Sequence, residues 1–431
     1  MQYYSLNKQA PNVSFKEATV LGQAPDKGLY FPEKIPQLAK SLIADIKSYK
    51  KEELAFKVML PYVGGTIADE ALYEIVSETI DFEFPLVKIN NQIASLELFH
   101  GPTLAFKDVG ARFMSRCLGY FSQNQSNKVT VLVATSGDTG GAVANGFLGV
   151  EGVDVVILYP SGKVSPVQEL QLTTCGQNIT ALEVAGTFDD CQAMVKSAFM
   201  DADLLAKMQL TSANSINVAR WLPQQLYYFF AYQQWNEEAP PVIAVPSGNF
   251  GNICSGLLAY VSGLPVQHFI AACNENDAVP EYLRTGNYAA KQAVATISNA
   301  MDVGSPSNFV RILELFENQY ETIKALVSGY TVSDAITRQV MADVFKSDNY
   351  ILDPHGAVAY YALNDYLHQH SNQKGFILET AHPVKFPDTV EEMIGQQLPI
   401  PATAQALFGK EKHSILLKAG FDALKEYLMS R

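Results

Sequence analysis

A lysine in an apolar stretch is the first residue of this chain whose surroundings suggest chemistry. Lys107 ends the run FHGPTLAFK, where Leu104, Ala105 and Phe106 directly precede it. Apolar surroundings destabilise the ammonium form and lower the pKa of a lysine, which frees the amine to attack a carbonyl. A surface lysine at the start of a helix has the same local composition, so this pattern alone leaves both interpretations open.

Two loops of small residues follow strand-like runs and are suited to anions. The first is SGDTGG, which begins at Ser136 after VTVLVAT, and the second is SGNFGN, which begins at Ser247 after VIAV. Their glycines let backbone N–H groups approach a ligand or adopt a positive φ, and each loop precedes a helix-like stretch whose first N–H groups lack intrahelical partners. Glycine after a strand is also common in tight turns. Two such loops at the carboxyl ends of sheet strands favour a phosphorylated ligand.

Other catalytic signatures are missing from the sequence. It contains no G-x-S-x-G, H-E-x-x-H or G-x-x-x-x-G-K-[ST] pattern, and no G-x-G-x-x-G follows a strand-like run. The five cysteines are widely spaced without a C-x-x-C pair, so we expect neither a disulfide framework nor a metal site. They are Cys117, Cys175, Cys191, Cys254 and Cys273.

The anion loops need a scaffold of strands and helices, and the sequence has the pattern of one. Short β-branched runs occupy residues 129–135, 154–159, 179–184, 242–245, 268–273 and 376–378. Helix-like stretches lie between some of them, at residues 142–148, 189–200 and 253–260. Because no hairpin signals separate these runs, the pattern predicts crossover connections, parallel sheets and an α/β fold.

Domain organisation is predicted from changes in composition along the chain. Residues 1–90 read as an N-terminal unit, and residues 91–400 as the catalytic core, with a smaller mobile α/β subdomain at about 125–200. Residues 401–431 are expected to form a C-terminal helix that packs on the core. Its apolar residues follow the spacing of one helix face: Leu417, Phe421, Leu424 and Leu428.

Composition and charge restrict the partners. The 431 residues carry a formal net charge of −13, with 31 Lys+Arg against 44 Asp+Glu and no basic run, so we expect no nucleic-acid partner. The first residues lack the apolar core of a signal peptide, and no run of about 18 apolar residues follows, so we expect a cytoplasmic protein without a membrane partner. The sequence leaves the oligomeric state open.

Five segments together resemble the threonine synthase family. They are VSFKEATVLGQAPDKGLYFPEKIP, LELFHGPTLAFKDVGARFM, TSGDTGGAVANGF, PSGNFGN and ETAHPVKFP, in this order from about residue 12 to residue 387. The first two are specific to that family, whereas the glycine loops are shared with other pyridoxal-phosphate (PLP) enzymes of the tryptophan-synthase-β type. The resemblance implies PLP fold type II: two open parallel-sheet α/β domains with a cleft between them, plus an N-terminal helical unit.

The resemblance also implies roles for individual residues. Lys107 matches the lysine that carries PLP covalently and moves protons between substrate carbons, and Thr380 matches the hydroxyl that faces the pyridine nitrogen. Residues matching the loop around the cofactor phosphate are Gly248, Asn249, Phe250, Gly251 and Asn252. Residues expected to face the substrate carboxylate or phosphate are Ser136, Gly137, Asp138, Thr139, Ser215, Asn217 and Arg220.

The sequence leaves two of these implied residue roles open. Asp138 stands where many relatives have an asparagine that donates to the phenolic oxygen of PLP, and an ionised aspartate only accepts; alternatively it caps a helix. The cations that hold the substrate phosphate are also open, because Arg112, Lys163 and Lys385 are candidates beside Arg220.

The reaction implied is conversion of O-phospho-L-homoserine and water to L-threonine and phosphate, by γ-elimination and β-addition of water. Two alternatives remain: a serine or threonine dehydratase of the same fold, and a PLP- or phospho-ligand-binding regulator without turnover. A plain nucleotide-binding module would explain the glycine loops but not HGPTLAFKD or the segment around Thr380.

Overall fold

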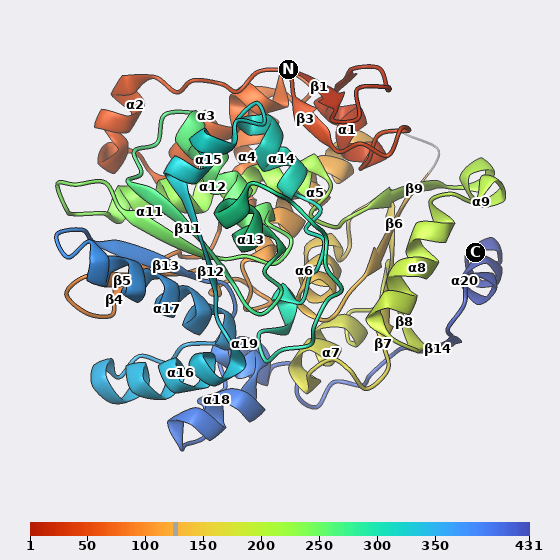
Figure 1. The fold of residues 1–431 in the computed structure, drawn as a ribbon. Coiled ribbons are helices and arrows are strands. Elements are labelled where there is room, and N and C mark those ends of the chain that lie inside the picture. The colour runs from red at the N-terminus through yellow and green to blue at the C-terminus, as the bar shows by residue number, and fades with distance from the viewer. Residues whose placement is uncertain (124–127) are drawn as a thin grey trace.

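The structure is a computed structural model that describes residues 1–123 and 128–431, whose strands form three sheets (Figure 1). A small antiparallel sheet lies at the N-terminus, and two larger sheets are built almost entirely from parallel strands. The α/β class and the parallel sheets predicted from the sequence are confirmed.

The largest sheet has the strand order β12-β11-β10-β13-β5-β4, in which β4 alone runs antiparallel to its neighbour. Its strands are β4 Leu86–Lys88, β5 Ile93–Glu97, β10 Val242–Pro246, β11 His268–Cys273, β12 Val327–Thr331 and β13 Gly375–Glu379. Alternate residues of β10 enter two different apolar clusters, with Ile243 and Val245 in one and Val242 and Ala244 in the other. Helices therefore cover both faces, which is why this strand reads as a continuous apolar run.

Helix α17 (Pro354–Gln369) packs on β10, β11 and β13 from one side, and α12 (Gly251–Val261) packs on β10 from the other. Both lie beside the largest sheet in Figure 1. Helix α5 Lys107–Ser122 packs on the second parallel sheet and its first helix. The remaining helices of this part of the chain are α10 Val218–Trp221, η2 Leu222–Gln225, α11 Leu226–Gln234, α13 Ala278–Thr285, η3 Asn299–Met301, α14 Phe309–Leu315, α15 Tyr320–Leu326, α16 Asp334–Asp348, η4 Pro383–Lys385, α18 Pro387–Ile394 and α19 Ala402–Gln405.

The second parallel sheet has five strands in the order β14-β8-β7-β6-β9. Its strands are β6 Val129–Ala134, β7 Val153–Pro160, β8 Ile179–Ala185, β9 Gln209–Ser212 and β14 Ile415–Lys418. Its helices are α6 Asp138–Phe147, α7 Pro166–Thr173, α8 Phe188–Ala198, α9 Ala202–Lys207 and α20 Phe421–Met429. The sheet thus extends past residue 200 through β9 and recruits a strand from the end of the chain.

The N-terminal region combines helices with a sheet. Its elements are β1 Gln2–Ser5, β2 Val13–Ser14, α1 Phe15–Leu21, β3 Tyr30–Pro32, α2 Lys40–Ala44, η1 Ile46–Ser48, α3 Lys51–Val63 and α4 Asp69–Thr79. Strand β1 pairs antiparallel with both β2 and β3, and α1 and α4 pack on α5. The helical unit expected here therefore also contains a small sheet, which Tyr3, buried in β1, attaches to the main core.

The C-terminal stripe of apolar residues is divided between two elements. Leu417 lies in β14, and α20 begins only at Phe421, after Gly420 with φ +149°. The prediction that the four apolar residues share one helix face is therefore wrong for Leu417. Leu424 and Leu428 are fully buried, and α20 packs on α8, so the rest of the stripe does contact the body.

Across residues 1–123 and 128–431, the structure contains no helix both long and apolar enough to span a membrane.

Candidate active site

Lys107 is the first residue of α5 and lies next to the end of β13. The N–H of Phe106 donates to the carbonyl of Thr380 over 2.9 Å, and the hydroxyl of Tyr227 donates to the carbonyl of Phe106. The structure therefore brings together two predicted site residues, Lys107 and Thr380, that lie far apart in the sequence.

The turn before Lys107 is held in one conformation by a left-handed residue. Leu104 has φ +59°, which a branched side chain seldom adopts, and its carbonyl accepts a hydrogen bond from the N–H of His382 over 3.0 Å. Ala105 and Ala381 form an isolated antiparallel bridge. Such strain persists where surrounding contacts over-determine the backbone, as they do here.

Electrostatics around Lys107 favour a free amine. Its side chain is half-buried, and burial is the main cause that lowers the pKa of Lys107 from its usual value. The carboxylate of Asp138 opposes this change, while the positive charges of Lys385 and Arg220 add to it. The sequence-based expectation of a lysine with a lowered pKa is consistent with these surroundings.

Asp138 and Lys385 form a buried ion pair beside Lys107. Their side chains are 6% and 0% exposed, and Lys385 Nζ lies 2.7 Å from Asp138 Oδ1. The amide of Gln168, on α7, donates to the same Asp138 oxygen over 2.9 Å. Burial raises the pKa of Asp138, but the charges of Lys385 and Lys107 and the hydrogen bonds from Lys385 and Gln168 outweigh it and hold this pKa far below its usual range, so the carboxylate is ionised although it is buried.

Thr103 joins this ion pair to the loop that carries Lys107. Its carbonyl accepts hydrogen bonds from Lys385 Nζ (2.8 Å) and from the amide of Gln171 on α7 (3.0 Å). Its N–H donates to Asp108 over 2.9 Å, and its hydroxyl donates to the same carboxylate. Groups from both large sheets thus meet in one hydrogen-bonded network.

The loop Ser136–Thr139 is closed by a residue that the sequence analysis did not select. The hydroxyl oxygen of Thr135 accepts from the N–H groups of Gly137 (2.9 Å) and Gly140 (2.8 Å). Gly137, with φ +138°, is the N-cap of α6, so Asp138 lies inside the helix and is not its cap. Ser136 and Thr139 are half-buried.

The second loop opens α12 with a residue in the left-handed region. Phe250, with φ +61°, is the N-cap, and the helix begins at Gly251. The amide nitrogen of Asn252 is buried without a hydrogen-bond partner among the described residues, while its oxygen accepts from Tyr228 over 2.9 Å. An unsatisfied buried donor beside the free N–H groups of a helix N-terminus fits an anion.

The glycines of this loop are required by packing. Gly248 and Gly251 have no positive φ; a Cβ on Gly248 would lie 2.7 Å from Met301 Cα, and a Cβ on Gly251 would lie 3.3 Å from the Asn308 amide nitrogen. Of the two reasons expected for these glycines, a positive φ and a close approach of the backbone, the structure has the second. Asn249 is exposed, and its side-chain oxygen accepts from Ser307.

Ser215 and Asn217 are placed differently from each other. The Ser215 hydroxyl accepts from Asn308 over 3.1 Å, and its Cβ would face a Cβ on Gly251 at 3.5 Å, so it lies beside the second loop. Asn217 is fully buried; its amide donates to two carbonyls, and its oxygen accepts from Ala219 as the N-cap of α10. Asn217 therefore serves the protein's own backbone.

Arg220 is a buried cation against the first turns of α5. It is 3% exposed, and its Nε has no partner among the described residues. A Cβ on Gly110 would lie 3.0 Å from that Nε, which shows how closely Arg220 approaches α5. Burial lowers the pKa of Arg220 to about 10, so it is charged at neutral pH.

Two other candidate cations lie away from Lys107. Arg112 donates to the carbonyl of Glu78 and pairs with Asp81 over 2.6 Å, and Lys163 is exposed. Within the described part of the chain, no group of three or more His, Cys, Asp or Glu side chains is placed to hold a metal ion.

Comparisons with known proteins agree on one family. Residues 83–378 match the family model described as pyridoxal-phosphate dependent enzyme, residues 2–80 that of the threonine synthase N terminus, and residues 356–428 that of the threonine synthase C-terminal region. A threonine synthase of Haemophilus influenzae is 43% identical over 100% of both chains.

The chain belongs to the threonine synthase family. The crystal structure of threonine synthase from Escherichia coli is 42% identical, has a TM-score of 0.93 and is covered completely, as is this chain. That of PLP-bound threonine synthase from Brucella melitensis is 34% identical with a TM-score of 0.92, over 100% of this chain and 99% of that one. A threonine deaminase from Solanum lycopersicum, 14% identical with a TM-score of 0.55, shares the fold alone.

PLP, the cofactor of this family, fits the residues described above. Lys107 offers an amine with a lowered pKa to the aldehyde, and the unpartnered amide of Asn252 lies where a phosphate needs donors. The structure adds residues that the sequence analysis missed: Thr135, Gln168 and Gln171. Thr135 begins the segment TSGDTGGAVANGF but was not selected from it, whereas Gln168 and Gln171 belong to no recognised motif and are revealed only by three-dimensional contact.

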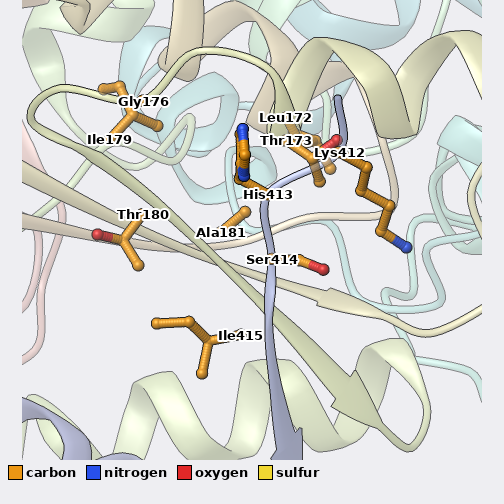
Figure 2. A pocket seen from close by; sticks show the side chains of 10 residues that line it. All are labelled: Leu172, Thr173, Gly176, Ile179, Thr180, Ala181, Lys412, His413, Ser414 and Ile415. Carbon is orange, nitrogen blue, oxygen red and sulfur yellow. The ribbon is translucent and has the colours of Figure 1, made fainter. Parts of the chain in front are cut away.

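A hollow at the protein surface lies away from this site. It measures about 300 Å³ and is formed by α7, β8 and the segment before β14 (Figure 2). Lys412 on its rim pairs with Glu169 (2.6 Å) and Glu183 (2.8 Å), so that cation is already neutralised. None of the predicted site residues lines the hollow, and we do not assign it to the catalytic reaction.

Proposed function

We propose that this chain is a PLP-dependent lyase that converts O-phospho-L-homoserine and water to L-threonine and phosphate. The observation that carries the proposal is the position of Lys107, a half-buried lysine with a lowered pKa beside Thr380 and three charged side chains. Membership of the threonine synthase family supports the choice of substrate.

Lys107 is the proposed proton carrier. Bound PLP supplies an electron sink that stabilises negative charge on the substrate carbons next to it. Between turnovers the amine of Lys107 would hold the cofactor, and when free it would take a proton from Cα of the substrate and return one at a later step. Its lowered pKa increases the share of neutral amine available for this role.

Two phosphate groups need separate sites. We propose that the N-terminus of α12, with Asn252 and Ser215 beside it, holds the cofactor phosphate. Arg220 is the proposed cation for the substrate phosphate, because it is buried near Lys107 and its Nε is unpartnered among the described residues. The loop Ser136–Thr139 is proposed for the substrate carboxylate, with two hydroxyls and the N-terminus of α6.

Local positive charge opposes the charge of the whole chain. Lys385 and Arg311 are fully buried, and Arg311 donates only to neutral oxygens, those of Ser215, Ile216, Asn308 and Tyr30. In a chain with a net charge of −13, a buried cation such as Arg311, whose hydrogen bonds go to neutral oxygens, makes the site attractive to anions. Closure of the two parallel-sheet regions over the site would exclude bulk water from the reactive intermediates.

We also propose a cytoplasmic location. All five cysteines are free thiols in the structure, and four of them are buried. Free thiols are typical of a reducing compartment, where disulfides do not persist.

The test is a pair of assays on the full-length protein with PLP. Release of inorganic phosphate and formation of threonine from O-phospho-L-homoserine are expected, whereas pyruvate and ammonia from L-serine are not. The variant Arg220→Gln should raise KM for phosphohomoserine, and Arg112→Gln, its matched control, should leave KM unchanged. Rapid deamination of serine without phosphate release would favour the dehydratase alternative, and PLP binding without either activity would favour the regulator.

A further inference from the structure

The Asp138–Lys385 pair is expensive to bury and is not explained by the proposed roles of its neighbours. Removing two charges from water costs several kcal/mol per ion, so buried pairs are weak contributors to stability unless they serve another purpose. Lys385 Nζ reaches Asp138 Oδ1 at 2.7 Å and the Thr103 carbonyl at 2.8 Å, with no exposed surface. Its position beside Lys107 suggests what that purpose is.

Asp138 is the one negative charge, among those acting on Lys107, that stabilises its ammonium form. If Asp138 had no other partner, it would pair with Lys107 and keep that amine protonated. Lys385 and the amide of Gln168 both bind the same oxygen of Asp138, Oδ1. Asp138 comes from the start of α6 and Lys385 from η4, so the pair also joins the two large sheets.

We propose that Lys385 is a positioning residue that occupies the Asp138 carboxylate, so that Asp138 cannot pair with Lys107 and the Lys107 amine stays free to attach the cofactor. This rests on the proposed role of Lys107. Attachment of PLP to Lys107 needs no further reactant. The amine nitrogen attacks the aldehyde carbon of PLP, a C=N bond forms, and the aldehyde oxygen leaves as water with both amine hydrogens.

The charged and titratable groups around Lys107 together determine how readily its amine is protonated. Asp138 lies on α6, Lys385 on η4 and Arg220 on α10, and the pKa of Lys107 responds to all three. Asp108, the next residue on α5, has a pKa raised by burial, and the pKa of Tyr227 is also raised by burial. Tyr227 therefore stays neutral near pH 7, and both carboxylate oxygens of Asp108 accept hydrogen bonds from Thr103.

The two single variants are predicted to act in opposite directions. Lys385→Gln removes a positive neighbour and frees Asp138, so the pKa of Lys107 should rise, by about one pH unit. Asp138→Asn removes the negative charge and leaves Lys385 and Arg220, so the pKa of Lys107 should fall by a similar amount. The double variant should lie between them, near the unmodified protein.

The measurement is competitive labelling of lysines with acetic anhydride on the full-length protein, freed of cofactor with hydroxylamine. Mass spectrometry of the Lys107 peptide from pH 6 to pH 11 gives its pKa without any assay of activity. A second readout is the rate at which added PLP attaches, followed by absorbance; at pH 7 it should fall about tenfold in Lys385→Gln, since one pH unit is a tenfold change in free amine.

Controls separate this role from a merely structural one. Lys425→Gln removes a lysine of α20 that pairs with Asp201 and Asp203, and it should not change the labelling of Lys107. Helix α20 lies at the edge of the molecule in Figure 1, beyond α8. Thermal unfolding identifies variants that are simply misfolded, and the double variant keeps the pair neutral if a single variant is unstable.

The outcomes are distinguishable from failure of the proposed function. Borohydride reduction that labels Lys107, combined with unchanged or same-direction shifts in both single variants, would overturn this inference alone. Borohydride label on another lysine would overturn the role of Lys107 first. Opposite shifts that largely cancel in the double variant would support the inference.

Discussion

Lys107 is the side chain on which the proposed chemistry depends most directly. Its amine lies between an ion pair and a buried arginine, at the first turn of α5, and burial lowers its pKa. A lysine in such a place does two things in turn, attaching the cofactor and moving protons. Removing the amine by mutation should distinguish cofactor attachment from proton transfer.

Lys107→Ala should keep PLP through the N-terminus of α12 but lose turnover. Because a positioned acid–base group contributes about 10²- to 10⁴-fold, we expect a loss of at least that size in kcat. Equilibrium dialysis measures retention, and borohydride reduction with peptide mapping should label Lys107 in the unmodified protein only. Full activity in the variant, or label on another lysine, would contradict the assignment.

Thr380 should leave the pyridine nitrogen of PLP unprotonated, because a neutral hydroxyl donates its hydrogen bond without adding charge. Thr380→Asp places a carboxylate there, which favours the protonated ring. Nitrogen-15 NMR of labelled PLP should detect the added proton, and the ratio of side products to threonine should increase. Thr380→Ser is the matched control that keeps the hydroxyl. A ring nitrogen protonated already in the unmodified protein would end this argument.

Sequence motifs located these two residues but not their surroundings. Lys107 and Thr380 stand in short stretches whose pattern is recognisable, and the structure places them side by side. Lys385 was one of several candidate cations, and nothing in the sequence indicates that it pairs with Asp138, because the two meet only when both sheets have formed. Nor does the sequence indicate that the side chain of Asn217 is hydrogen-bonded to backbone groups of the protein itself.

The elements that carry the site are more predictable than their contacts. The expected strand at residues 268–273 matches β11, and that at 242–245 matches β10 within one residue. The short edge strands β12 and β9 were not predicted, because VSGYT and QLTS contain few apolar residues. Edge strands are defined by their neighbours' hydrogen bonds more than by their own composition.

The junction of β10 and α12 depends on a glycine that packs against another segment. Gly248→Ala should weaken PLP retention about tenfold, because its Cβ would lie 2.7 Å from Met301 Cα and 2.9 Å from the Ala300 carbonyl oxygen. Gly251→Ala, whose nearest contact is 3.3 Å, should have a smaller effect. Titration of PLP into both proteins measures the difference; equal affinities would mean that the loop tolerates displacement.

The first residue of β11 links the stability of the largest sheet to pH. His268 is 9% exposed and lies 2.7 Å from the hydroxyl of Ser328 on β12; burial lowers its pKa from 6.5 to about 4. Between these values the unfolded chain binds a proton that the folded protein does not, so stability falls as pH decreases from about 6.5 toward 4.

His268→Gln should remove part of this acid sensitivity while keeping a hydrogen-bonding side chain. The histidine alone accounts for a loss of about 2 kcal/mol in the free energy of unfolding between pH 7 and pH 5. Urea unfolding of both proteins at the two pH values measures it. The same loss in the variant would show that other groups are responsible.

At the level of the molecule, the chain has a net charge of −13, yet its centre gathers buried cations from several elements. The composition gives the net charge but does not indicate the buried cations, because only the fold determines which side chains are buried. The limits predicted for the domains at residues 90, 125–200 and 401 remain a prediction, although the five-stranded sheet draws strands from both sides of two of these limits.

The C-terminal segment should contribute strongly to stability. Leu424→Ala empties a fully buried position between α20 and α8 and should cost about 2–5 kcal/mol. Ile415→Ser, at an exposed position of β14, is the matched control and should cost little. Denaturant unfolding followed by circular dichroism compares them; equal costs would mean that α20 is only loosely attached.

Strand β14 is synthesised after all the other strands in the described part of the chain. It pairs with β8, which ends at Ala185, so the ribosome makes the two partners far apart in time. At about 5–20 residues per second the interval is roughly 10–50 s. Throughout it, the nascent chain carries β8 with one edge unpaired, and an open edge can bind a strand of another chain. Fast completion of translation, or a chaperone that covers β8, would therefore protect this protein while it is being made.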